Sequence, residues 1–174
     1  MNLRMYLRIP TFVDHFFFTA LFNLVSFIIA NISLFDNEWI KAYYMNLSFT
    51  MGVCCTFKTL PFLNVTLVFM FIIVTFSAGS TFMSISTWIF NLKKAPDVSV
   101  TKWSRICVLF NILTSLLTIF VLIYFGLSFA GSMFRKLMKG FFSLSTCYWL
   151  LIPIVILNSL SIFCIASKTS LLPR

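Results

Sequence analysis

Charged side chains are scarce in this sequence, and their scarcity excludes most soluble folds. Only 10% of the 174 residues are Asp, Glu, Lys or Arg, whereas 60% are hydrophobic. A soluble domain carries about 25% charged residues, because its surface must meet water. The apolar residues also come in long runs rather than in the short alternations of a buried core. The sequence therefore predicts a protein whose solvent is lipid.

Reactive and metal-binding side chains are equally sparse. The chain has one histidine, four acidic residues and five cysteines, and no two cysteines stand at C-x-x-C spacing. Zinc and thioredoxin-like sites depend on such pairs, and a catalytic centre needs a nucleophile–base pair or a cluster of metal ligands. We therefore expect no catalytic residue, no metal and no cofactor, and we predict that the protein is not an enzyme.

The net charge of +9 does not indicate nucleic acid as a partner. The Lys and Arg residues stand in small clusters between apolar runs, whereas a nucleic-acid-binding protein concentrates them on one surface. Clusters that flank apolar runs are typical of membrane proteins, in which they set orientation. The expected partners are the lipid bilayer and other membrane proteins, or further copies of this chain.

Four apolar runs are each long enough to cross a bilayer, whose core needs about 20 helical residues. They cover residues 12–35, 62–90, 106–130 and 141–166. The first run is too long for a signal peptide, and no small-residue cleavage site follows it, so we expect a retained helix. The predicted fold class is an all-α membrane protein: one domain, residues 1–174, forming a bundle of four transmembrane helices with short loops.

The distribution of cations predicts that both termini face the cytoplasm. With that orientation, eight of the 13 Lys and Arg residues lie on the inner side and five on the outer side. Cytoplasmic loops carry the excess of Lys and Arg in membrane proteins. The pair Arg135–Lys136 would then lie outside, which is the main observation against this orientation.

Polar and small residues within the runs indicate where helices meet. Ser77, Gly79 and Ser80 form a small-residue patch in the second run, and small residues let helix backbones approach closely. Asn111 and Asn158 lie in the third and fourth runs. We expect them to form interhelical hydrogen bonds, worth about 1 kcal/mol each. The alternative is that they line a conduction path.

Asp14 and His15 are the candidate ionisable pair near the start of the first run. Neighbours on a helix point about 100° apart, so they do not form a ready dyad. We interpret them as an interfacial pair at headgroup level. The alternative is a proton-coupled role, because ionisable residues in a membrane are often functional.

The first outer connection holds candidates for covalent modification. Cys54 and Cys55 are adjacent, and adjacent cysteines rarely bond each other. Cys147, near the outer end of the fourth run, is a candidate disulfide partner for either; free or lipidated thiols are the alternative. Asn46 begins an Asn-Leu-Ser sequon in the same connection and is a candidate glycosylation site.

Several short motifs resemble a known superfamily. Trp39 stands shortly after the first run in NEWIKAYYMN, and the segment MGVCC follows it with Cys54 and Cys55. Arg105 leads into the third run in SRICVLFNIL, and Trp149 and Pro153 stand at W-x-x-x-P spacing in the fourth. With the four-span layout, these residues make the chain similar to the peripheral myelin protein, epithelial membrane protein and claudin superfamily.

The resemblance implies a four-helix fold, cytoplasmic termini and a place in the plasma membrane, with the endoplasmic reticulum as the alternative. Departures from the family limit what else it implies. No tryptophan stands at the G-L-W-x-x-C position, and no second loop cysteine follows Cys55 at the family's spacing. The first outer connection is also shorter than a claudin's, and we expect it to be too small for that family's usual extracellular sheet.

Two functions fit these observations. The first is a non-enzymatic, claudin-like tetraspan protein that acts as a membrane organiser, an adhesion component or an auxiliary subunit of a larger complex. Its working surfaces would be the patch around Gly79 and the polar side chains of the last two runs. The alternative is a small oligomeric channel or transporter with Asp14, His15, Asn111 and Asn158 along its route.

Overall fold

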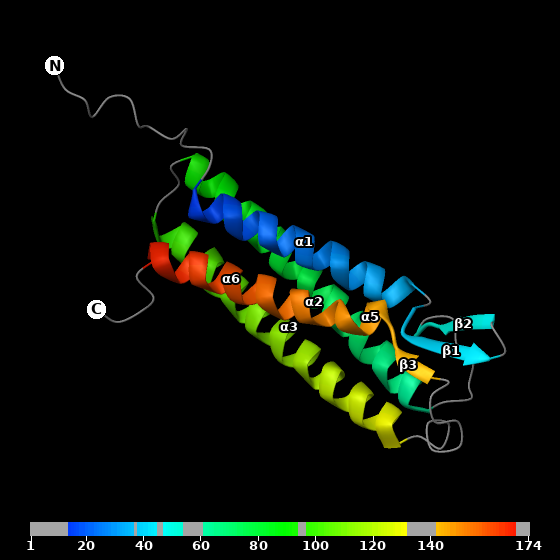
Figure 1. Ribbon diagram of the computed structural model, residues 1–174. Coiled ribbons are helices and arrows are strands. Elements are labelled where there is room, and N and C mark those ends of the chain that lie inside the picture. Colours follow the sequence, from blue (N-terminus) through cyan, green and yellow to red (C-terminus); the bar gives the residue numbers. More distant parts are fainter. Residues whose placement is uncertain are drawn as a thin grey trace.

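Four long helices run side by side and carry a small β-sheet at one end of the bundle (Figure 1). This computed structural model describes residues 14–36, 38–44, 47–53, 61–93, 97–131 and 142–169. The first three helices are α1 (His15–Phe35), α2 (Pro61–Leu92) and α3 (Asp97–Gly131). The fourth consists of α5 (Thr146–Trp149) and α6 (Leu151–Thr169). All four are long and apolar enough to cross a membrane, which confirms the predicted four-helix membrane fold.

The helices form a closed ring of four. Around it the order is α1, α2, α3, α6, and each helix packs on the two beside it. The start of α1 and the end of α6 lie together, with His15 Nδ1 3.4 Å from Ser167 Oγ. We call this the terminal end of the bundle, and the opposite end the sheet end.

The buried side chains of each helix follow a coiled-coil spacing. On α2 the buried positions 63, 66, 70, 73, 77, 80, 84 and 87 follow alternating steps of three and four residues, and Thr81 is buried beside Ser80. On α3 and α6 the buried positions follow the same steps. A repeat of 3.5 residues keeps one narrow seam facing the neighbours and indicates a left-handed supercoil. The remaining faces are apolar and exposed, as in Phe82 and Phe163, which suits contact with lipid.

A sheet nevertheless forms at this end of the bundle, and the first connection supplies two of its three strands. Residues Ile40–Tyr44 form β1 and Leu47–Met51 form β2, and these two strands make an antiparallel hairpin. The short strand β3 (Phe142–Leu144) pairs with the other edge of β1. A two-stranded hairpin alone is only marginally stable in water. The third strand, supplied by the segment before α5, gives β1 a second hydrogen-bonded neighbour. It also joins the two connections at this end of the bundle.

Two helices begin at other residues than the apolar runs do. Helix α3 begins at Asp97 rather than at 106, because a helix can continue beyond the lipid while Lys102 and Arg105 extend toward water. The predicted fourth run began at 141, but its first residues form β3 instead. The fourth helix is interrupted at Leu150, between α5 and α6. Pro153 stands in the first turn of α6, where its missing N–H leaves no bond unmade within that helix.

Candidate functional site, a sheet at one end and a buried polar seam

Trp39 fixes the sheet to the helices. It is fully buried, its indole N–H donates to the carbonyl of Ser33 in α1, and its ring centroid lies 4.9 Å from that of Phe125 in α3. Phe125 also contacts Phe62 of α2 at 5.5 Å and Tyr148 of α5 at 5.7 Å. One aromatic cluster therefore holds all four helices beneath the sheet, and such ring pairs add about 0.5–1.5 kcal/mol each beyond their burial.

The backbone of Trp39 completes this attachment. Its N–H donates to the carbonyl of Met51 at 3.0 Å, and its carbonyl accepts from the N–H of Ser145 at 3.0 Å. The N–H of Cys147 donates to the carbonyl of Glu38 at 3.1 Å. The chain after α1 is thus hydrogen-bonded on both sides, and the sheet and α5 are one rigid unit.

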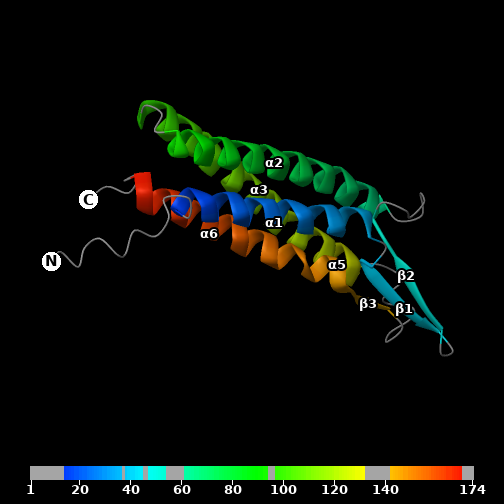
Figure 2. The same cartoon turned by 90° about the horizontal axis from the view of Figure 1, so that it is seen from above.

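The two faces of the sheet differ in chemistry. Ile40 and Ala42 are buried toward the bundle, whereas Lys41 and Tyr43 alternate with them on the opposite face. This alternation is typical of an antiparallel sheet with one face in water. Figure 2 shows the hairpin projecting past the helix ends. Phe49, which pairs with Ala42, is therefore 53% exposed although it belongs to the apolar face.

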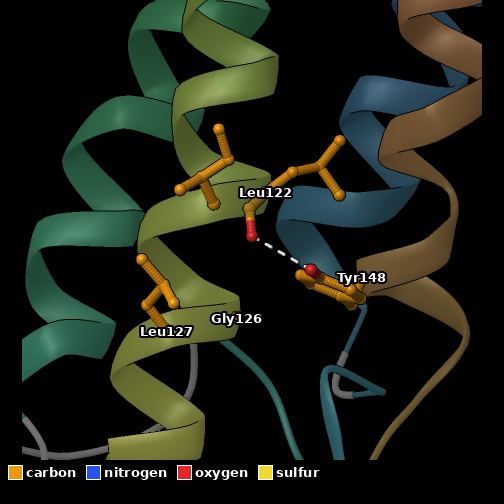
Figure 3. A pocket seen from close by; sticks show the side chains of 5 residues that line it. Leu122, Gly126, Leu127 and Tyr148 are labelled. Atoms are coloured by element: carbon orange, nitrogen blue, oxygen red, sulfur yellow. Dashed lines mark hydrogen bonds between the residues drawn. The ribbon is translucent and has the colours of Figure 1, made fainter.

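A groove of about 330 Å³ lies between α3 and α5 at the sheet end (Figure 3). Tyr148 forms one wall, and its hydroxyl donates to the carbonyl of Leu122 at 3.0 Å. A Cβ atom on Gly126 would stand 2.9 Å from this hydroxyl oxygen, so only glycine leaves room for the contact. Leu127, also in the lining, is 69% exposed, and the groove therefore opens toward the lipid.

The buried seam changes character along the bundle. Toward the sheet end it is mostly apolar, with side chains such as Met70, Ile73, Val121 and Ile154, although Ser33 and Thr66 are also fully buried there. Toward the terminal end it carries hydroxyl, amide and thiol groups at the same spacing. These fully buried residues include Thr19, Asn23 and Ser26 of α1, Ser77, Ser80 and Ser84 of α2, Ser104, Cys107, Asn111 and Thr114 of α3, and Asn158 and Ser161 of α6. We call this set the polar seam.

One chain of hydrogen bonds in the polar seam crosses all four helices. Asn111 Nδ2 donates to Ser161 Oγ of α6 at 3.0 Å and lies 3.7 Å from Cys107 Sγ, one turn away. Asn23 Nδ2 of α1 lies 3.4 Å from both Cys107 Sγ and the carbonyl oxygen of Ser80 in α2. The hydrogen bond from Asn111 confirms the interhelical role that the sequence predicted for it.

Asn158 differs from that prediction. It is fully buried one turn before Ser161, yet neither its Nδ2 nor its Oδ1 has a hydrogen-bond partner in the described part of the chain. No partner among the described residues is found either for Asn23 Oδ1, Asn111 Oδ1, Ser26 Oγ and Ser77 Oγ, or, outside the polar seam, for Ser33 Oγ and Ser115 Oγ. A buried polar group left unpaired costs about 1–3 kcal/mol. The polar seam thus holds several groups whose bonding is incomplete within the chain.

Asp14 and His15 lie at the terminal end, where each binds a different helix. Asp14 Oδ1 accepts from the N–H of Phe17 at 2.9 Å and caps α1, while Oδ2 accepts from Nδ2 of Asn91 in α2. His15 faces Ser167 of α6. This geometry favours the interfacial interpretation, because both side chains join helix ends and neither reaches the polar seam.

The small-residue patch lies inside the bundle and is not an outer working surface. A Cβ atom on Gly79 would stand 2.7 Å from Cε1 of Phe110 in α3, so glycine permits this helix contact. Ser77 and Ser80 are fully buried beside it, as are Asn111 and Asn158 on their own helices. The expectation that these residues meet a partner protein is therefore wrong, since neighbouring helices of the same chain already cover them.

The remaining candidate residues lie near the two ends of the bundle. Arg105 is exposed at the terminal end of α3, and Trp149 is 53% exposed at the sheet end, where tryptophan suits a membrane interface. Cys147 is buried and is bonded to no other cysteine in the described part of the chain. Cys54, Cys55 and Asn46 lie outside the described residues, so the predicted disulfide and glycan remain predictions. Within the described ranges, no three His, Cys, Asp or Glu residues stand close enough together to hold a metal ion.

No protein-family model matches this chain, and the comparison with curated proteins gives no match. The assignment as a multi-pass membrane protein therefore rests on the four helices themselves.

Proposed function

We propose that this chain is a non-enzymatic, claudin-like tetraspan protein of the plasma membrane, with both termini in the cytoplasm. It acts as an organiser, an adhesion component or an auxiliary subunit of a larger membrane complex, through the sheet at its outer end. The observation that carries the proposal is this sheet. Its strands come from both connections at that end, and Trp39 anchors it to the helices.

The sheet supports the claudin-like interpretation because the short first connection was one of the departures from that family, and this connection still contributes two strands. It also replaces the patch around Gly79 as the working surface. Tyr43 on one face is 50% exposed and Phe49 on the other is 53% exposed, and both belong to a projecting hairpin. Aromatic side chains are enriched where proteins bind each other. A rigid strand pair that displays two of them is suited to docking a partner's outer domain.

Photo-cross-linking in native membranes tests this proposal. A benzophenone amino acid replaces Tyr43 in one variant and Phe82, a lipid-facing residue in the middle of α2, in the control. We expect the hairpin variant to form a cross-linked species of discrete higher mass and the control to label lipid. Monomeric protein in both variants, under conditions in which the probe reacts with solvent, would contradict the proposal.

A second candidate function, a small channel or transporter, is favoured by the polar seam. The seam lies within one copy of the chain rather than between copies, and Asp14 and His15 lie at the same end of the bundle. Purified protein in liposomes would then conduct an ion or a solute, and Asp14→Asn would lower that flux. Liposomes that stay impermeable while the same protein cross-links through Tyr43 would favour the organiser.

A further inference from the structure

The polar seam carries more hydrogen-bonding capacity than the chain itself uses. The unpartnered groups include oxygen acceptors, a complete amide and hydroxyl groups. Asn23 Oδ1 and Asn111 Oδ1 accept only, and Asn158 offers an acceptor and two donor hydrogens. Ser26 and Ser77 each offer a hydroxyl that can do both. These residues lie on all four helices, and each side chain is fully buried.

The mixture of donors and acceptors identifies the chemistry of a guest. A bare cation would satisfy the oxygen atoms but leave the Asn158 amide hydrogens unpaired. An anion would accept from the Asn158 amide hydrogens but leave the oxygen acceptors unpaired. No positively charged side chain lies in the seam to balance its charge. Only a neutral molecule that both donates and accepts matches the whole set. Buried waters have this property and make about three hydrogen bonds each to otherwise unsatisfied polar groups.

We propose that the polar seam is an internal water-binding site, a hydrated compartment in the terminal half of the bundle. Waters bridge the Asn23, Asn111 and Asn158 side chains and the hydroxyl groups of Ser26 and Ser77. The apolar layers of Met70, Ile73, Val121 and Ile154 close the compartment toward the sheet end. This inference rests on the fold and does not depend on the proposed function, because a hydrated seam is compatible with either an organiser or a channel.

Two native sulfur atoms make the inference testable without altering the chain. Cys107 lies in the polar seam and Met70 in the apolar layers, and both are fully buried. Hydroxyl radicals produced by brief X-ray irradiation oxidise sulfur side chains beside bound water, and mass spectrometry measures each rate. The protein is irradiated in lipid nanodiscs, and each rate is normalised to the rate of the same residue in the denatured chain.

We expect Cys107 to be oxidised several-fold faster than Met70. The variant Asn158→Leu removes two unpartnered groups and breaks no hydrogen bond in the described chain, and it should slow oxidation at Cys107 several-fold. The neighbouring variant Ser159→Leu changes an exposed residue and should leave the rate unchanged.

Equal protection of Cys107 and Met70 in the unaltered protein would overturn the proposal, because both would then be dry. Fast oxidation of Cys107 that Asn158→Leu leaves unchanged would also overturn it, because radicals would be reaching the thiol by another route. The comparison within the unaltered chain decides the matter even if the leucine variant does not fold. Neither measurement depends on a partner or on transport.

Discussion

Replacement of Gly79 by alanine tests the helix contact that the structure builds most tightly. The new Cβ would lie 2.7 Å from Cε1 and 3.0 Å from Cδ1 of Phe110, closer than carbon atoms approach without a shift. The Phe110 ring is held in turn by an edge contact with Phe76, their centroids 5.5 Å apart. Overpacking of this kind costs about 1–3 kcal/mol. Alanine recovers about 0.5–1 kcal/mol through its helix propensity, so the net loss should be about 1 kcal/mol.

The control is Gly131→Ala, at the end of α3, where a Cβ would meet no atom within 4 Å. It should leave stability unchanged or raise it slightly, since nothing opposes the gain in propensity. Reversible unfolding in mixed detergent micelles gives the free energy of unfolding of both variants. The double variant Gly79→Ala with Phe110→Leu should show a coupling energy, because the smaller side chain relieves the contact. Equal free energies of unfolding for Gly79→Ala and Gly131→Ala would contradict the close approach of α2 and α3 at Gly79.

Three further variants probe the sheet anchor, the polar seam and the helix cap by the same assay. Trp39→Ala should lower the free energy of unfolding by about 3–5 kcal/mol, the usual cost of emptying a buried aromatic site; Trp149→Ala, at an exposed position, should cost far less. Ser161→Ala removes the acceptor for Asn111 and should cost about 1–3 kcal/mol, whereas Ser159→Ala should change stability by no more than about 0.5 kcal/mol. Asp14→Ala removes the cap of α1 and should cost about 1 kcal/mol. A Trp39 variant no less stable than its control would refute the anchor.

The helices were predictable because lipid imposes a simple requirement on sequence. Every backbone group must be paired inside the span, so a long apolar run can only be a helix. The ends of the spans were less certain, since α3 extends past its apolar part and carries Arg105 with it. Hydropathy indicates which residues lie in the lipid, whereas hydrogen bonding and capping decide where a helix ends.

The sheet was missed because its pairing is not local. Residues 40–44 and 47–51 are each a short strand, and the strand that pairs with the far edge of β1 comes from residues 142–144. Loop length alone therefore underestimated what the connection could form. The alternation of Ile40, Lys41, Ala42 and Tyr43 was a visible signal of a half-buried strand.

The polar seam was also visible in part. On α3 the buried Ser104, Cys107, Asn111, Thr114 and Thr118 follow steps of three and four residues. Mean hydropathy hides this pattern, because the outer faces of the helix are so apolar. Two of the threonines also bond to carbonyls one turn back, so they are tolerated in lipid without an external partner. Which polar groups meet across helices depends on the neighbours and could not be derived from one segment.

The central claim is a membrane-embedded bundle whose two ends emerge on one side and whose sheet lies on the other. Protease protection in sealed vesicles tests it most directly, with one epitope tag at each terminus and a third in the connection between β2 and α2. The account predicts that the two terminal tags share one accessibility and that the connection tag has the opposite one. Terminal tags on opposite sides, or a chain that stays monodisperse in buffer without detergent, would contradict the account.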